Sequence, residues 1–168
     1  MISNSAQRAS LVPTHPRISL YVSKTNYTHD LVMESGAAGI HLLRRDQWDL
    51  IWHLGLQSGR DVDKLESLDT TTLTTGVPVL RDVFVAYDCR VINTMDAGGS
   101  TFFLLEVVDA LEGRAGDVMT SDHFRAHMPP DKKIIYEQRL IDAMGDLKQM
   151  SENVDPSKRW TGPAATVR

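Results

Sequence analysis

The stretch VFVAYDCRVINTMDAGGSTFFLLEVVDA, residues Val83–Ala110, decides the fold. In its first half, apolar side chains recur at every second position, which is the period of a strand with one buried face; they are Val83, Val85, Tyr87, Cys89 and Val91. The Asp-Ala-Gly-Gly-Ser sequence that follows has the composition of a tight turn, and Thr101–Ala110 is again rich in apolar and β-branched residues. The stretch therefore predicts a long antiparallel hairpin.

The segments on either side of this hairpin predict further strands and short helices. Residues 17–23 and 37–43 have strand periodicity, with a short helix expected over 28–35, and Asp46 is placed to cap another helix. Apolar residues at helical spacing predict a C-terminal helix over 132–150. A Rossmann fold would need regular strand–helix alternation and a G-x-G-x-x-G turn, and the sequence has neither. The pattern predicts a mainly β protein, a small antiparallel barrel with helices.

The composition limits the classes of function. The chain has 168 residues and a net charge of −4, which does not favour a nucleic-acid partner. No apolar run is long enough to cross a membrane, and the first residues lack the apolar stretch of a signal peptide, so we expect a cytoplasmic protein. Cys89 is the single cysteine, which excludes an internal disulfide and a cysteine-based metal cluster. We expect one domain over residues 1–152 and a flexible tail over 153–168.

A polar turn separates the strand at 17–23 from the helix at 28–35. An ammonium group and several hydroxyl and amide groups gather where the helix is expected to begin, namely Ser23, Lys24, Thr25, Asn26 and Thr28. A helix N-terminus offers unpaired backbone N–H groups and the positive end of its dipole, so this turn suits a bound anion. The same residue types also form ordinary helix caps. The residues alone leave both interpretations open.

The order of these segments resembles the flavin reductase-like family of FMN-binding split barrels. The resemblance spans about Asn4–Ala110 and rests on the stretches NSAQRASLVPTHPRISLYVSKTNYTH, ESGAAGIHLL, QSGRDVDKL, TGVPVL and CRVINTMDAGGSTFFLLEVVDA. It implies an antiparallel split β-barrel with a C-terminal helix. It also implies FMN as the cofactor, with FAD, haem or a deazaflavin as alternative ligands, and NAD(P)H as the electron donor.

The resemblance implies where the flavin would bind. The polar turn would hold the flavin phosphate, with charge from Lys24 and hydrogen bonds from Asn26 and Thr28, and His29 would orient the turn. The N-terminal strand would lie against the isoalloxazine ring, because small residues allow close approach of the backbone. The residues matched to that strand are Asn4, Ser5, Ala6 and Ser10.

The family features that bind the nicotinamide dinucleotide are only partly present in this sequence. The resemblance implies that Arg60 and Lys64, in the loop Ser58–Lys64, would meet the phosphates of a nicotinamide dinucleotide. Many family members carry Gly-Asp-His in the hairpin turn, whereas this turn reads Gly98-Gly99-Ser100. Ser100 thus stands where the family has an imidazole near both flavin and nicotinamide. Two functions follow: an NAD(P)H:flavin oxidoreductase, or a non-catalytic dimeric flavin-binding or electron-transfer protein.

No catalytic residue of the protein itself is predicted, because the cofactor carries the chemistry. No metal site is predicted either, since His123 and His127 have helical spacing but lack a third ligand in the sequence.

The resemblance also implies partners. It implies a homodimer with the flavin site at the interface, and a flavin-dependent monooxygenase that would receive reduced flavin. Family domains usually have a strand before the segment that matches MISNSA, and this sequence starts at that segment. We expect the barrel to be completed by the C-terminal region or by a second subunit, or the natural chain to begin upstream. The helix over 132–150 would pack across the interface or over its own barrel.

Overall fold

The structure is a computed structural model, and it describes residues 7–8, 16–152, 154 and 157. Asn4, Ser5, Ala6 and Ser10, and nearly all of the tail expected at 153–168, lie outside the described residues. In chain order, the elements are β1 (Gln7–Arg8), β2 (Arg17–Ser23), α1 (Tyr27–Ser35), β3 (Ala37–Leu42), η1 (Arg45–Gln47), α2 (Trp48–Gly55), β4 (Thr70–Thr72), β5 (Pro78–Leu80), β6 (Val85–Asp96), β7 (Ser100–Glu112), α3 (Ser121–Ala126) and α4 (Pro130–Ser151).

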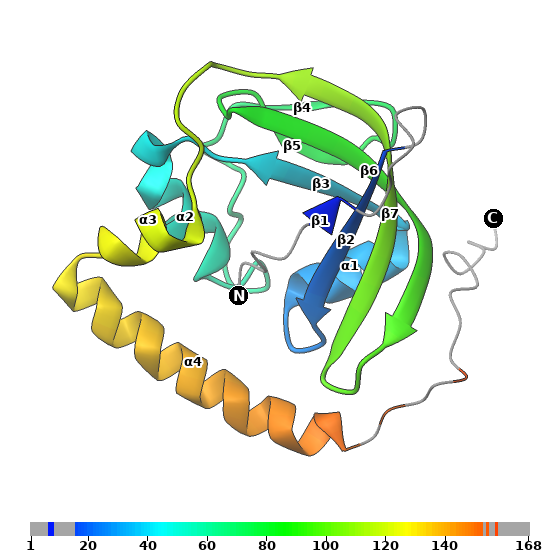
Figure 1. Cartoon of the computed structure of the whole chain (residues 1–168), viewed down its shortest axis with the longest axis vertical. Helices are drawn as coiled ribbons and strands as arrows, with labels where there is room; N and C mark the ends of the chain where they lie inside the picture. Colours follow the sequence, from blue (N-terminus) through cyan, green and yellow to red (C-terminus); the bar gives the residue numbers. More distant parts are fainter. Residues whose placement is uncertain (1–6, 9–15, 153, 155–156, 158–168) are drawn as a thin grey trace.

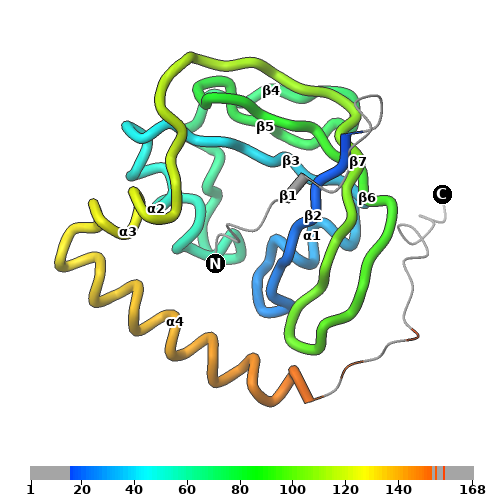
Figure 2. Tube along the Cα trace, viewed as in Figure 1, coloured from blue at the N-terminus to red at the C-terminus, as the bar shows by residue number. Residues whose placement is uncertain are grey.

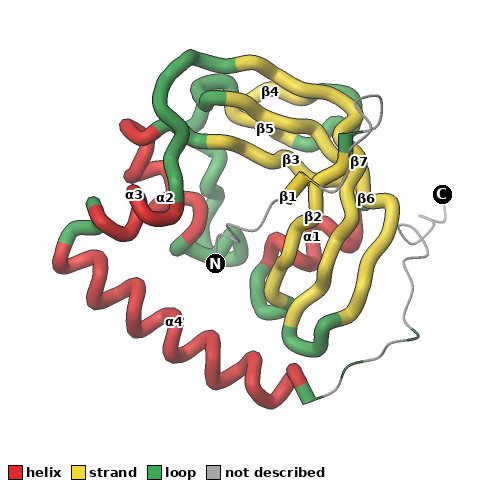
Figure 3. Tube along the Cα trace, viewed as in Figure 1, coloured by secondary structure: helices red, strands yellow, loops and turns green. Residues whose placement is uncertain are grey.

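Five antiparallel strands form one curled sheet in the order β1-β2-β7-β6-β3, and β4 and β5 form a separate pair (Figures 1 and 3). The predicted hairpin is confirmed as β6 and β7. Its long ribbon runs beside β2 to a tip that lies near the last turn of α4 (Figure 2). The protein is mainly β with helices, a curled antiparallel half-barrel with a C-terminal helix, as the sequence predicts.

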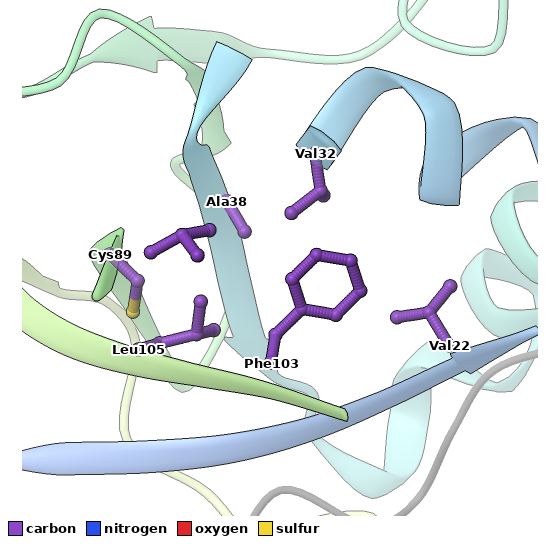
Figure 4. Packing of buried hydrophobic residues seen from close by; sticks show 7 residues of the cluster. Val22, Val32, Ala38, Cys89, Phe103 and Leu105 are labelled. Carbon is purple, nitrogen blue, oxygen red and sulfur yellow. The ribbon is translucent and has the colours of Figure 1, made fainter. Parts of the chain in front are cut away.

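The core lies inside the curl, where α1 covers the sheet. Buried side chains from β2, α1, β3, β6 and β7 meet there (Figure 4); they are Val22, Val32, Ala38, Cys89, Val91, Phe103 and Leu105. Burial raises the pKa of the Cys89 thiol to about 12, so this cysteine behaves as a small apolar residue.

A second apolar cluster lies where β5 meets β6, and it contains Val79, Leu80, Val83 and Ala86. The pairing of β6 with β7 shifts register between Asp88 and Cys89. Simple alternation along β6 places Ala86 in this cluster, whereas Tyr87, Cys89 and Val91 on the other face belong to the first one. The strand is therefore buried on both faces over this stretch.

The helix starts differ from the sequence prediction in detail. α1 begins at Tyr27 with Asn26 as its N-cap, so Thr28 is its second residue and not its cap. Asp46 lies inside the short helix η1, and α2 begins at Trp48 after Gln47. The prediction of Asp46 as a cap is wrong because η1 takes the place of the first turn of the expected helix.

The C-terminal helix α4 lies along the side of the molecule and is held at its two ends (Figure 1). Near its start, the Lys132 ammonium lies 4.9 Å from the ring centre of Trp52. At its end, Ser151 and Leu147 pack against Gly98 and Gly99 of the hairpin tip. No residue of α4 is buried, and the whole helix is described. The helix therefore contacts its own barrel at its two ends, and packing across an interface stays a prediction.

Candidate functional site

The turn between β2 and α1 brings polar groups to the start of a helix. Asn26 has extended backbone, with φ −81° and ψ 132°, and the chain turns into α1 directly after it. The His29 N–H donates to the carbonyl oxygen of Asn26 at 2.9 Å, whereas the N–H groups of Tyr27 and Thr28 have no carbonyl of the helix to bind. The exposed Thr28 lies in this first turn. The arrangement is one that attracts anions through its backbone dipole.

Lys24 points from this turn to the hairpin tip. Its Nζ donates to Oδ1 of Asp96 at 2.7 Å, and the two side chains are only 20% and 7% exposed. The backbone N–H of Lys24 donates to the carbonyl oxygen of Gly99 at 3.0 Å. The positive charge of Lys24 is therefore matched by a carboxylate of the same chain.

His29 forms a second link between the turn and the sheet. Its Nε2 lies 2.9 Å from Oγ1 of Thr101, the second residue of β7. The imidazole packs edge-on against the Phe103 ring, with 5.8 Å between ring centres. His29 therefore fixes the first turn of α1 to β7.

The loop that contains Arg60 and Lys64 brings only one of these cations to the turn. The Arg60 guanidinium lies 4.8 Å from the ring centre of Tyr27 and forms an ion pair with Asp30, so it lies beside the first turn of α1. It is 48% exposed and remains accessible to an anion. Lys64 instead donates to the carbonyl oxygen of Leu54 at 2.7 Å, near the end of α2, and burial lowers its pKa.

Ser100 is the hairpin residue for which the resemblance implied a place near flavin and nicotinamide. It opens β7 opposite Ser23 of β2, and only 1% of its surface is exposed. Its neighbour Gly98 has a φ of +72°, a conformation that favours glycine. The structure thus brings Ser100 close to the polar turn but buries it.

The structure gathers Lys24, Asn26, Thr28, His29, Arg60 and Ser100 around one corner, where β2, α1 and the hairpin meet. Sequence reasoning missed the acidic partners of the two cations, Asp96 and Asp30. Asp96 reads as an ordinary turn residue in Asp-Ala-Gly-Gly-Ser. Its distance from Lys24 along the chain hides the pairing, which the β2–β7 register creates.

Other groups of charged or aromatic side chains are engaged in ion pairs or packing within the protein. A cavity of about 370 Å³ lies over the buried Arg44, whose guanidinium forms ion pairs with Asp46 and Asp82. Trp48 and Trp52 are half-buried and stack with 6.0 Å between ring centres, as expected for packing residues.

Over the described residues, no three histidine, cysteine or acidic side chains are close enough to hold a metal ion. None of the described helices has the length and hydropathy needed to span a bilayer.

Comparisons with known proteins agree with the fold and with the order of its segments. A family model described as a flavin reductase like domain matches residues 1–128. A ferric-chelate reductase (NAD(P)H) of Archaeoglobus fulgidus is 31% identical over 106 residues, which cover 62% of this chain and 63% of that protein.

Two solved structures extend this likeness. An FMN-binding protein from Thermus thermophilus, with bound 1-cyclohex-2-enone, has a TM-score of 0.60 and 26% identity over 66% of this chain and 60% of that one. The flavin reductase component of a bacterial two-component tryptophan halogenase shares the fold, with a TM-score of 0.60 and 24% identity over 69% of this chain and 72% of that one. The alignments cover less than two thirds of the length of the Archaeoglobus and Thermus proteins.

Proposed function

Because this chain belongs to the flavin reductase-like family, whose model matches residues 1–128, we propose that it binds FMN and transfers a hydride from NAD(P)H to the flavin. The observation that carries this proposal is the first turn of α1, where Thr28 is exposed and the Arg60 guanidinium lies beside Tyr27. Backbone N–H groups, a hydroxyl and a guanidinium are the donors that a phosphate monoester requires.

In this proposal the residues of the turn have different tasks. Thr28 and the first N–H groups of α1 donate to the flavin phosphate, and Arg60 supplies positive charge. Arg60 therefore serves the flavin phosphate in preference to a nicotinamide dinucleotide, because it contacts Tyr27 and Asp30 of α1. Lys64 keeps its structural bond to Leu54. FAD, which also carries phosphate, is the alternative cofactor.

Bound FMN would supply the hydride-accepting ring, so the protein's part is to hold and orient the flavin and to exclude water. Ser100 lacks an imidazole and is 1% exposed, which favours a second candidate function: a flavin-binding or electron-transfer protein that does not oxidise NAD(P)H efficiently.

One experiment separates the two functions. The protein is saturated with FMN without oxygen, NADH or NADPH is added, and the flavin absorption band is followed. Bleaching by one donor is the expected result, and it identifies the donor that the reductase uses. An FMN-loaded protein that neither NADH nor NADPH bleaches would contradict the reductase and favour the second candidate.

The proposal includes a homodimer with the flavin at its interface. Tyr21, Phe102 and Met95 are neighbours across β2, β7 and β6, and all three side chains are exposed. An exposed apolar row on a sheet is a surface that a second copy can cover. We expect the protein to be dimeric by light scattering and Phe102→Asp to be monomeric. Ile141→Asp, on the exposed face of α4, is the matched control and should remain dimeric. A monomeric wild-type protein would contradict the dimer.

Release of reduced flavin to an oxygenase belongs to the same proposal. One structural neighbour is described as the reductase component of a two-component halogenase. For this chain a monooxygenase that uses reduced flavin is the corresponding partner.

A further inference from the structure

We propose that Asp96 is a positioning residue for the flavin site. In this proposal Lys24 holds the polar turn in place through its ion pair with Asp96 and does not bind the phosphate. This inference rests on the proposed function. Asp96 is the last residue of β6, and its Oδ1 accepts hydrogen bonds from Lys24 Nζ at 2.7 Å and from the Gly98 N–H at 2.9 Å. One carboxylate oxygen therefore holds both the polar turn and the hairpin tip.

Two further bonds make the turn and the hairpin one unit. The Lys24 N–H donates to the Gly99 carbonyl oxygen at 3.0 Å, and His29 Nε2 lies 2.9 Å from Thr101 Oγ1. Their partners in the hairpin, Gly99 and Thr101, both follow Asp96 along the chain. The first turn of α1 therefore keeps its position only while the hairpin tip keeps its own.

The ion pair between Lys24 and Asp96 is shielded from water, so its loss should affect the position of the polar turn. Asp96 is 7% exposed and Lys24 is 20% exposed. Removing one partner of such a pair leaves the other charge poorly solvated, whereas removing both partners together avoids that penalty. The effects of the two single substitutions should therefore not add.

The pairing also decides which cation can serve the phosphate. A phosphate that approached the Lys24 ammonium would meet the Asp96 carboxylate 2.7 Å from it, so the repulsion offsets the attraction. Arg60 also has an acidic partner, Asp30, but it is 48% exposed and a guanidinium has further N–H donors. Loss of Lys24 should therefore act through the shape of the site, and affect the flavin ring and the phosphate alike.

The test compares FMN with riboflavin, which lacks the phosphate. Dissociation constants are measured by quenching of flavin fluorescence for wild type, Lys24→Met, Asp96→Asn and the double variant, well below the unfolding temperature of each. We expect each single substitution to weaken binding of both flavins, by about tenfold, and the double variant to bind no more weakly than either single one. Lys24→Arg, which keeps the ion pair, should bind as wild type does.

If Lys24 were a ligand of the phosphate, Asp96→Asn would not weaken FMN binding. If Lys24 binds the phosphate, Asp96→Asn releases the ammonium and tightens FMN binding or leaves it unchanged, while Lys24→Met weakens FMN binding alone. Either result would overturn the inference, as would additive effects. Asp69→Asn removes a more exposed ion pair with Arg81 and is the matched control, expected to bind both flavins normally. A wild-type protein that binds no flavin would overturn the proposed function itself, which separates the two failures.

Discussion

His41 is a titratable side chain that the fold keeps neutral. It lies on β3, and its Nε2 accepts the backbone N–H of Leu80 at 3.0 Å, which ties β5 to the main sheet. Burial lowers the pKa of His41 from 6.5 to about 4. Protonation would place a charge in this site and remove the acceptor for the Leu80 N–H.

The depressed pKa of His41 predicts a loss of stability in mild acid. Below pH 6.5 the unfolded chain takes up a proton at His41 that the folded protein does not, so the free energy of unfolding falls as the pH decreases from 6.5 to about 4. The loss amounts to at most about 3 kcal/mol. His41→Gln keeps an acceptor and does not titrate, and chemical denaturation across this range should show a shallower slope for it. Equal slopes for both proteins would contradict the prediction.

At the scale of elements, α4 depends on two glycines in the hairpin tip. A Cβ on Gly98 would lie 2.7 Å from Cα of Ser151, and one on Gly99 would lie 2.7 Å from Cδ2 of Leu147. The first contact is with backbone, which cannot rotate away. The last turn of α4 can therefore lie on the tip only while position 98 lacks a side chain, whereas at position 99 the end of the Leu147 side chain can move.

Two glycine-to-alanine substitutions are expected to have opposite effects: Gly98→Ala tests the contact, and Gly145→Ala tests the helix away from it. Gly98→Ala should destabilise the protein by about 1–3 kcal/mol, because its φ of +72° is strained for alanine and its Cβ would meet Ser151. Gly145→Ala, within α4, has open space around its Cβ and should stabilise by about 0.5–1 kcal/mol. Thermal and chemical unfolding measure both changes. A neutral Gly98→Ala would mean that α4 does not need the tip.

The elements were predictable from the sequence to different extents. The strand at 17–23 is found with the same bounds, and the hairpin and C-terminal helix differ by a few residues, because their periodicities are long and regular. The two-sided burial of β6 was not predictable, since alternation gives the two faces of the strand but not the residues of β5 and α2 that cover the second face. Asp88 is fully buried and accepts the N–H and hydroxyl of Thr75, a contact between distant segments.

For the polar turn, the sequence predicted which residues lie together but not their contacts. Lys24, Thr28 and His29 lie within six residues of one another in the sequence. They also lie together in the structure. Their partners Asp96 and Thr101 come from the hairpin, and only the pairing of β2 with β7 brings them near. The roles of the two cations therefore depend on tertiary structure.

At the scale of the whole molecule, one corner of the half-barrel contains the polar turn and the hairpin tip. There β2 ends, α1 begins and α4 ends (Figure 1). We propose that this corner holds a flavin by its phosphate. Charge-assisted hydrogen bonds contribute about 1.5–3 kcal/mol each, so the phosphate should have a large effect on affinity.

The most direct test is the ratio of the dissociation constants of wild-type protein for riboflavin and FMN, measured by titration with flavin fluorescence. We expect FMN to bind more tightly than riboflavin by about tenfold or more, as one retained charge-assisted bond would give. Equal affinity for the two flavins would contradict it, because the first turn of α1 would then hold no phosphate.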